Sequence, residues 1–299
     1  MNEEDIRKRY FDDKSLTDGQ EPLVKAGDKV IAGEDDRKDV YELVGGNAEQ
    51  QLHLELVQST VILTDKSDLT DNGNGTLTMA VAPFRQRNLP PCSDERFANQ
   101  FVGGWCSGFL VGDDLIATAG HCGRSENDIQ NTAYVFGFFA SSPTDPGRMV
   151  FNEDQVYFGR ELVAFDESGT GDYAIVRLDR KVDAPGAKPL KVRTSGEPSD
   201  GVNLGVIGYP SGLPVKVAFG DETRLMRKQD PWLIANLDTY GGNSGSAVFN
   251  SDGEVEGILV RGAVDYRFTG FCFRSNRIEN SDGSEAVTKA GVFQDKIPT

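Results

Sequence analysis

The chain has 299 residues, 38% of them hydrophobic, and 34 glycines, a composition that fits a globular protein with many turns. Its formal net charge of −16 makes nucleic acids and anionic membranes poor partners, because both are bound by clustered Lys and Arg. No apolar run is long enough to span a bilayer. We expect a monomer that binds neither nucleic acid nor membrane.

Residues 1–55 are highly charged and poor in strand signal, and we expect an N-terminal arm or a propeptide. Residues 52–56 within this stretch fit the alternation of a strand and the spacing of a helix equally well. The first five residues lack the basic and apolar regions of a signal peptide. The protein is therefore expected either to be cytosolic or to have lost an export signal by cleavage.

From residue 61 onward, short apolar runs are divided by Gly, Pro, Asn and Asp, and long helical periodicity is absent. This pattern predicts an all-β fold, a sandwich or barrels, and two barrels in sequence suit the length. A boundary between them fits near 181–189. The predicted strands are 61–63, 77–81, 107–111, 115–119, 134–138, 173–178, 202–207, 215–218, 233–237, 247–249 and 255–260.

The four cysteines form no Cys-x-x-Cys pair, and with only two histidines a zinc site is not expected. Cys106 and Cys122 bracket two apolar runs around residues 112–114, a pattern typical of a β-hairpin. A hairpin brings its ends together, so we expect a disulfide there, contributing roughly 3 kcal/mol. A bridge between Cys92 and Cys272 follows by elimination. Two disulfides favour a secreted or periplasmic protein whose export signal has been removed.

Two histidines are available as a general base, a role that suits the ordinary histidine pKa near 6.5. His53 lies in an alternating polar and apolar stretch near the charged arm, which predicts a surface side chain. His121 lies between residues 118–120 and Cys122, and these small neighbours leave room for the imidazole and its partners.

A carboxylate that orients such a base is best sought at the start of a buried strand. Asp172 opens the apolar run 173–178, where it can be shielded from water and still be hydrogen-bonded. Asp166 and Asp179 are alternatives. Asp166 lies in a loop rich in Glu, Ser and Gly, and Asp179 follows the strand beside Arg180, where we expect it to be solvated.

The turn 241–246, Gly-Gly-Asn-Ser-Gly-Ser, is suited to present Ser244 as a nucleophile. Small flanking residues let a substrate carbonyl approach and leave backbone N–H groups free to face it. A serine hydroxyl needs a base, and the base needs an orienting acceptor. His121 and Asp172 are the candidates upstream.

Residues 118–122, 172–176 and 242–246 resemble the histidine, aspartate and serine motifs of the chymotrypsin-fold serine proteases, and they occur in that family's order. The resemblance implies two antiparallel six-stranded β-barrels, in domains 56–185 and 186–299, after an N-terminal segment of residues 1–55. It also implies a serine endopeptidase that cleaves proteins or peptides through an acyl-enzyme intermediate without metal or organic cofactor. The implied triad is His121, Asp172 and Ser244, with an oxyanion hole formed by the N–H groups of Gly242 and Ser244.

Asn243 departs from the trypsin-like branch, which has an aspartate here that pairs with the amine freed by zymogen cleavage. Asn243 and Ser246 are similar to bacterial glutamyl endopeptidases, as are residues 237–240, 208–210, 30–31 and 36–37. That similarity implies a zymogen cleaved after Lys29, with Val30 as the first mature residue. A protease-fold binding or regulatory module that no longer cleaves is the alternative function, and the complete triad argues against it.

The preferred substrate side chain stays open. Thr239 matches a threonine that glutamyl endopeptidases place around an acidic side chain, but Leu259 replaces their histidine. Arg261 would attract an acidic side chain, whereas Asp238 or Asp265 would attract a basic one. Residues 260–262 are predicted to form an edge strand that pairs with an extended peptide. The candidate substrate-binding residues are Asp238, Thr239, Leu259, Val260, Arg261 and Gly262.

Overall fold

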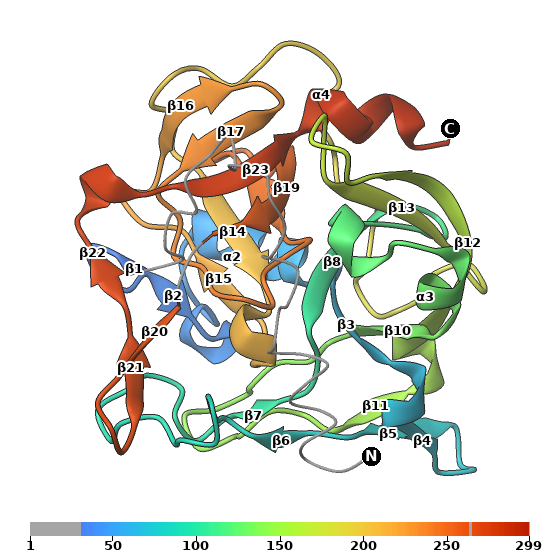
Figure 1. Cartoon of the computed structure of the whole chain (residues 1–299). Helices are drawn as coiled ribbons and strands as arrows, with labels where there is room; N and C mark the ends of the chain where they lie inside the picture. Colours follow the sequence, from blue (N-terminus) through green and yellow to red (C-terminus); the bar gives the residue numbers. More distant parts are fainter. Residues whose placement is uncertain (1–30, 263–264, 299) are drawn as a thin grey trace.

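The structure is a computed structural model, which describes residues 31–262 and 265–298 (Figure 1). The predicted cleavage after Lys29 lies outside the described residues. None of the helices in the described ranges is long and apolar enough to cross a membrane.

The N-terminal half contains a closed barrel of six antiparallel strands, in the order β10-β12-β13-β9-β8-β3. Several of these strands are buried along their whole length, because one face lines the barrel and the other is covered by neighbouring elements. The strands are β3 (Thr60–Asp65), β8 (Cys106–Gly112), β9 (Leu115–Thr118), β10 (Thr132–Phe136), β12 (Val156–Asp166) and β13 (Tyr173–Leu178). The sequence patterns had indicated all of them except β12.

The C-terminal half contains an eight-stranded sheet in the order β16-β17-β23-β19-β18-β14-β15-β2. This sheet curls without closing, and its last strand comes from the N-terminal segment. The strands are β2 (Arg37–Lys38), β14 (Gly205–Gly208), β15 (Lys216–Ala218), β16 (Leu225–Gln229), β17 (Trp232–Ala235), β18 (Ala247–Phe249), β19 (Val255–Arg261) and β23 (Glu285–Lys289). The expected two-barrel all-β fold is confirmed, and the first barrel has the expected six strands. The second differs from the expected six-stranded barrel, because its sheet stays open and has eight strands, one of them the N-terminal β2.

The two halves pack as one body, because a single apolar cluster includes Val61 and Phe109 of the first barrel and Ile207 and Phe249 of the second sheet. Smaller sheets join distant segments: β4 (Leu69–Asp71) with β5 (Thr76–Met79) and β11 (Val150–Asn152), β1 (Ile31–Ala32) with β22 (Arg277–Ile278), β6 (Ala82–Pro83) with β7 (Phe101–Val102), and β20 (Tyr266–Phe268) with β21 (Phe273–Ser275). The short helices α3 (Glu126–Gln130) and α4 (Ala290–Phe293) lie against β12 and β23.

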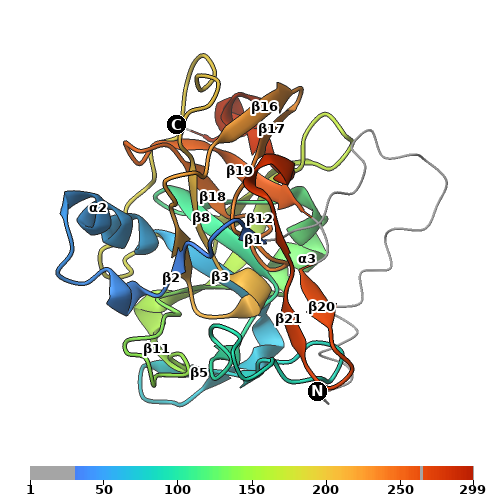
Figure 2. The same cartoon turned by 90° about the vertical axis from the view of Figure 1, so that its left-hand side faces the viewer.

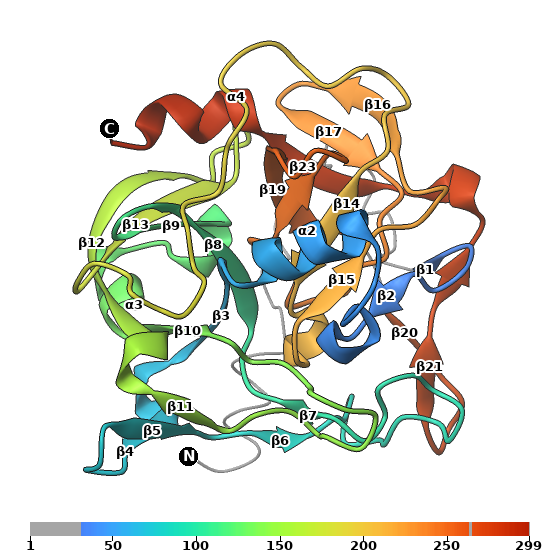
Figure 3. The ribbon, with the colours of Figure 1, turned by 180° about the vertical axis from the view of Figure 1, so that it is seen from behind.

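Helix α2 (Ala48–Val57) settles the ambiguity of residues 52–56 in favour of a helix. Asn47 caps it, since its side chain accepts the N–H of Gln50 and the Gln50 side chain accepts the N–H of Asn47. The helix lies across the back of the molecule, in front of β14 and β15 in Figure 3, and opposite the β20–β21 hairpin in Figure 2. The prediction of a surface His53 is wrong, because this side chain is only 5% exposed and stacks on Phe219 at 3.8 Å.

Both predicted disulfides are present, Cys106–Cys122 within the first barrel and Cys92–Cys272 between a loop and the β20–β21 hairpin. The second bridge joins residues 180 positions apart, so it ties the long loop between β6 and β7 to the C-terminal half.

Candidate active site

His121 and Asp172 meet because their strands are paired. His121 lies in the turn after β9, Asp172 directly precedes β13, and Thr118 of β9 is opposite Ala174 of β13. Asp172 Oδ2 lies 3.0 Å from His121 Nδ1, and its Oδ1 accepts the His121 backbone N–H at 3.1 Å. The Asp172 residue is only 2% exposed. Two hydrogen bonds to one buried carboxylate fix both the position and the ring orientation of the histidine.

Gly120 leaves room for this pair. A Cβ atom at position 120 would lie 2.3 Å from the Asp166 carbonyl oxygen and 3.1 Å from Asp172 Oδ1. The need for a small residue beside His121, inferred from the sequence, therefore has a steric basis.

The two alternative carboxylates are engaged elsewhere. Asp166 accepts hydrogen bonds from the backbone and hydroxyl of Ser168 and from the Thr170 hydroxyl, all within its own loop. Asp179 accepts the Phe158 N–H and pairs with Arg180 at an exposed position. Neither accepts a hydrogen bond from a histidine among the described residues.

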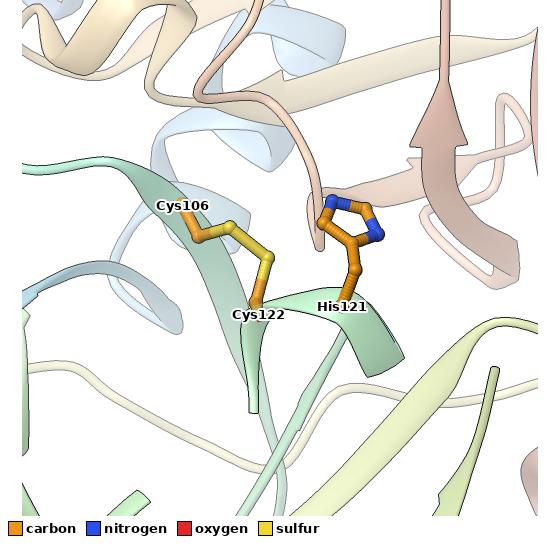
Figure 4. Close-up of side chains that lie close together, drawn as sticks. All are labelled: Cys106, His121 and Cys122. Atoms are coloured by element: carbon orange, nitrogen blue, oxygen red, sulfur yellow. A yellow bond between two sulfur atoms is a disulfide. The ribbon is translucent and has the colours of Figure 1, made fainter. Parts of the chain in front are cut away.

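The Cys106–Cys122 disulfide lies directly beside His121, and the imidazole stands alongside it (Figure 4). Both sulfur atoms and a ring nitrogen of His121 come within 4.8 Å of one another. Because the two sulfurs are bonded to each other, they offer no thiolate to a metal ion. The bridge instead anchors the turn that carries the histidine to β8.

Ser244 lies in the tight loop that leads into β18. The loop is closed by the Asn243 N–H donating to the Tyr240 carbonyl at 3.0 Å and by the Ser246 N–H donating to the Asn243 carbonyl at 2.9 Å. Gly242 has φ +92°, and a Cβ there would lie 2.5 Å from the Tyr209 carbonyl oxygen. Glycine is therefore required at position 242 by both conformation and space.

The first barrel holds this loop through Ser107 of β8. The Ser107 N–H donates to the Ser244 carbonyl at 2.8 Å, and its hydroxyl donates to the Gly242 carbonyl at 2.7 Å. Cys122 Sγ, one residue from His121, lies 3.8 Å from the same Ser244 carbonyl. The structure thus places the loop that carries Ser244 beside the turn that carries His121, where the two halves meet.

The backbone N–H groups of Gly242 and Ser244 donate no hydrogen bond within the part of the chain that the structure describes. The N–H between them, that of Asn243, is used to close the loop. The Asn243 side chain is buried, and its Oδ1 accepts the Ser246 hydroxyl at 3.3 Å. The N–H groups of Gly242 and Ser244 are therefore available as donors, and an oxyanion site needs such available donors.

Asp238 lies apart from any solvent-open subsite. Its residue is 1% exposed, and its two carboxylate oxygens accept the N–H groups of Ala32 at 2.9 Å and Asp36 at 2.7 Å. Burial raises the pKa of Asp238 to about 7, although the two backbone hydrogen bonds lower it. Asp238, which the sequence suggested as a partner for a basic substrate side chain, therefore binds the N-terminal segment instead.

The other candidate substrate-binding residues differ in exposure. Thr239 is buried, and its hydroxyl has no hydrogen-bond partner among the described residues. Leu259 and Val260 belong to the apolar core, whereas Arg261 is exposed, with its guanidinium 5.3 Å from the Trp232 ring. Gly262 follows β19 and is half-buried.

Strand β19 changes its pairing at its end. It pairs with β18 as far as Ile258 and with β23 as far as Arg261. Past Leu259, no strand in the described ranges pairs with β19 on the β18 side. The predicted edge at residues 260–262 is therefore open on one side.

Two contributors to the site had no sequence prediction. Ser107 lies within an apolar strand, and a buried hydroxyl needs a hydrogen-bond partner, so its position carried a signal. Arg37 is buried with its guanidinium 4.4 Å from the ring of Tyr240, next to the nucleophile turn. Its position in the charged N-terminal stretch had given no indication of burial.

Comparisons with known proteins agree with this geometry. The trypsin-like peptidase domain family matches residues 106–258, more than half of the chain. A glutamyl endopeptidase of Staphylococcus aureus strain MRSA252 is 26% identical over 240 residues, which cover 79% of this chain and 61% of the relative. The enzyme of the same name from strain MW2 is 27% identical over 243 residues, covering 79% and 67%.

This chain therefore spans less than two thirds of the first relative's length. A solved structure of a Glu endopeptidase in complex with MPD superposes with a TM-score of 0.51 at 15% identity, covering 89% of this chain and 97% of that one. That likeness concerns the fold alone. With the family match over residues 106–258, the chain belongs to the trypsin-like peptidase domain family.

Proposed function

We propose that the protein is a serine endopeptidase that hydrolyses peptide bonds of proteins or peptides through an acyl-enzyme intermediate. The observation that carries the proposal is the 3.0 Å contact between His121 Nδ1 and the buried Asp172 carboxylate, beside the loop that presents Ser244. The family membership and the glutamyl endopeptidase relatives support it.

In the proposed reaction, Ser244 Oγ forms a bond to the scissile carbonyl carbon while its proton moves to His121 Nε2. Asp172 accepts the Nδ1–H and stabilises the imidazolium. The oxyanion of the tetrahedral intermediate accepts hydrogen bonds from the N–H groups of Gly242 and Ser244. The C–N bond then breaks as His121 passes its proton to the leaving amine, and a water molecule repeats these steps on the ester.

We further propose a preference for an acidic side chain at the cleaved bond. Arg261 is an exposed cation next to the open edge of β19, whereas the Thr239 hydroxyl is buried and supports no direct contact with a substrate. Asp238 is already bound by backbone N–H groups, which counts against a basic side chain. The peptide would pair with residues 260–262, and Leu259 replaces the histidine that the family resemblance places there.

The remaining expectations stand as proposals too. We propose a secreted or periplasmic monomer, in line with its two disulfides, divided into residues 1–55, 56–185 and 186–299. The active form is proposed to begin at Val30. N-terminal sequencing of purified active protein tests this point, and an intact Met1 would contradict it.

The function is tested by labelling purified protein with a fluorophosphonate and by digesting an unbiased peptide library. We expect label on Ser244, loss of label and cleavage in Ser244→Ala and His121→Ala, and cleavage after acidic residues. A folded protein that neither labels nor cleaves, while a control protease does both, would favour the non-catalytic binding or regulatory module. Cleavage after basic or apolar residues would reject only the acidic preference.

A further inference from the structure

The nucleophile loop, defined as residues 240–246, begins with a tyrosine that is enclosed on two sides. Tyr240 is fully buried, and its ring lies 4.7 Å from the ring of Tyr266. The guanidinium of Arg37 lies 4.4 Å from the Tyr240 ring centroid. The Tyr240 backbone carbonyl accepts the Asn243 N–H. The residue whose ring is enclosed is therefore also the residue that closes the turn of the loop.

Arg37 is held rigidly in this position. It is 1% exposed, and its Nε and Nη2 atoms each donate to one Asp35 carboxylate oxygen at 2.8 Å. The Phe97 ring lies 5.2 Å from the same guanidinium. Two parallel hydrogen bonds to a carboxylate fix the plane of the guanidinium, and a planar cation packs well on an aromatic ring.

The segment that carries Arg37 is anchored on both sides of it. Upstream, the N–H groups of Ala32 and Asp36 bind Asp238, two residues before Tyr240. Downstream, Asp39 receives a hydrogen bond from the buried Lys216 Nζ at 2.8 Å. The N-terminal segment therefore contacts the approach to the nucleophile loop at Asp238 and the loop itself at Tyr240.

We infer that Arg37 is a positioning residue for the oxyanion hole. By fixing Tyr240 it fixes the turn from Tyr240 to Asn243, and with that turn the directions of the Gly242 and Ser244 N–H groups. Asn243 is uncharged and buried, so it forms no ion pair that would order the loop. We infer that Arg37, a cation of the N-terminal segment, orders the loop instead by packing on the ring of Tyr240. This inference rests on the proposed peptidase activity.

The test compares three variants of the active protein: Arg37→Met, Arg37→Lys and the control Arg96→Met. Arg96 binds the same Asp35 at 3.3 Å and lies over Phe97 at 4.7 Å, but it makes no contact with Tyr240 among the described residues. Each variant is assayed for kcat and KM on a peptide amide, and for binding of a peptide trifluoromethyl ketone and of the cleavage-product peptide from the leaving-amine side, which carries no carboxylate at the cleaved bond. Circular dichroism at the assay temperature checks that each variant is folded.

For Arg37→Met we expect kcat to fall by about 10²-fold with KM changed less than about 3-fold, because oxyanion donors act in the transition state. Affinity for the trifluoromethyl ketone, whose adduct carries an oxyanion, falls in parallel, while that for the product peptide does not. Arg37→Lys keeps the charge without the planar fork and should lose about 10-fold in kcat. Arg96→Met should stay within about 3-fold of the parent protein.

Unchanged kcat in folded Arg37→Met and Arg37→Lys, or an equal loss of ketone and product binding, would overturn the inference. If Arg37→Met does not fold, Arg37→Lys alone tests the inference. A loss of affinity for the ketone without a loss of affinity for the product peptide supports it, and equal losses overturn it. Failure of the proposed function gives a different result, since the unsubstituted protein would then neither cleave nor take the fluorophosphonate label.

Discussion

Replacing Gly242 by alanine tests the geometry of the nucleophile loop most directly. Gly242 has φ +92°, outside the conformations that a residue with a Cβ atom readily adopts. An added Cβ would lie 2.5 Å from the Tyr209 carbonyl oxygen, 2.8 Å from the Gly212 nitrogen and 2.9 Å from the Ser211 nitrogen. All three are backbone atoms, so the overlap is relieved only by moving the loop.

The expected magnitude has two parts. A backbone held in a sparsely populated conformation costs on the order of 1–3 kcal/mol, and relief of the overlap adds to it, so we expect unfolding free energy to fall by about 2–4 kcal/mol. Any shift of the loop also turns the Gly242 N–H away from the oxyanion. Loss of one such donor costs about 10²–10³ in kcat, so turnover should fall by that factor while KM changes little.

The assay measures kcat and KM on a peptide amide together with urea unfolding of the same samples. Gly241→Ala is the matched control, because its Cβ would meet only one atom within 4 Å, Asp265 Oδ2 at 3.0 Å, at the end of a side chain. We expect that control within about 5-fold of the parent kcat. Full activity of Gly242→Ala, or equal losses in the two variants, would refute the assignment of the Gly242 N–H to the oxyanion hole.

Three further predictions concern stability. The double variant Cys106→Ser/Cys122→Ser opens a loop of 16 residues' separation and should lose about 3 kcal/mol in urea unfolding, and an unchanged midpoint would count against a stabilising bridge. The folded pKa of Asp238, about 7, exceeds the unfolded value, so the folded protein holds a proton that the unfolded chain releases above about pH 4. Relative to Asp238→Asn, the parent should therefore lose about 4 kcal/mol of stability as the pH rises from 4 to 7, and a pH-independent difference would contradict this. Lys216→Met leaves the buried Asp39 without its cation and should cost about 3–5 kcal/mol, partly recovered in Lys216→Met/Asp39→Asn, and a recovery of zero would argue against the pair.

The parts of the site that were predictable from the sequence are those set by neighbours along the chain. His121 lies between small residues and a cysteine, Asp172 opens a buried run, and Ser244 lies among glycines, so each carried its own local signal. The hairpin between Cys106 and Cys122 is equally local, since its strands are joined by a short turn. Local steric needs, such as the glycine at position 242, leave a trace in the sequence itself.

The parts that escaped prediction depend on partners far along the chain. From the sequence, Asp238 was predicted to be a free carboxylate. In the structure it accepts two N–H groups of the N-terminal segment, from residues that lie 202 and 206 positions away. His53 was predicted to lie at the surface because the sequence pattern of its segment fitted a strand and a helix equally well. Its burial comes from the distant Phe219, whose ring packs on it. Arg37 is buried by an aspartate two residues away and by two aromatic rings that are remote in sequence. A pattern of polar and apolar residues does not report such pairings.

The arrangement of the site makes the contact between the two halves part of its geometry. His121 and Asp172 are fixed within the first barrel, whereas Ser244 lies on a loop of the second sheet, so no covalent neighbour sets the distance between base and nucleophile. Ser107 of the first barrel bridges that gap with hydrogen bonds to the carbonyls of Gly242 and Ser244, the two residues proposed to supply the oxyanion donors. Those bonds engage the carbonyls and not the N–H groups of Gly242 and Ser244, so the contact that joins the halves is compatible with the proposed oxyanion hole. A small displacement of one half against the other would therefore disturb the proposed nucleophile and the proposed oxyanion site together, before any strand of either half is lost.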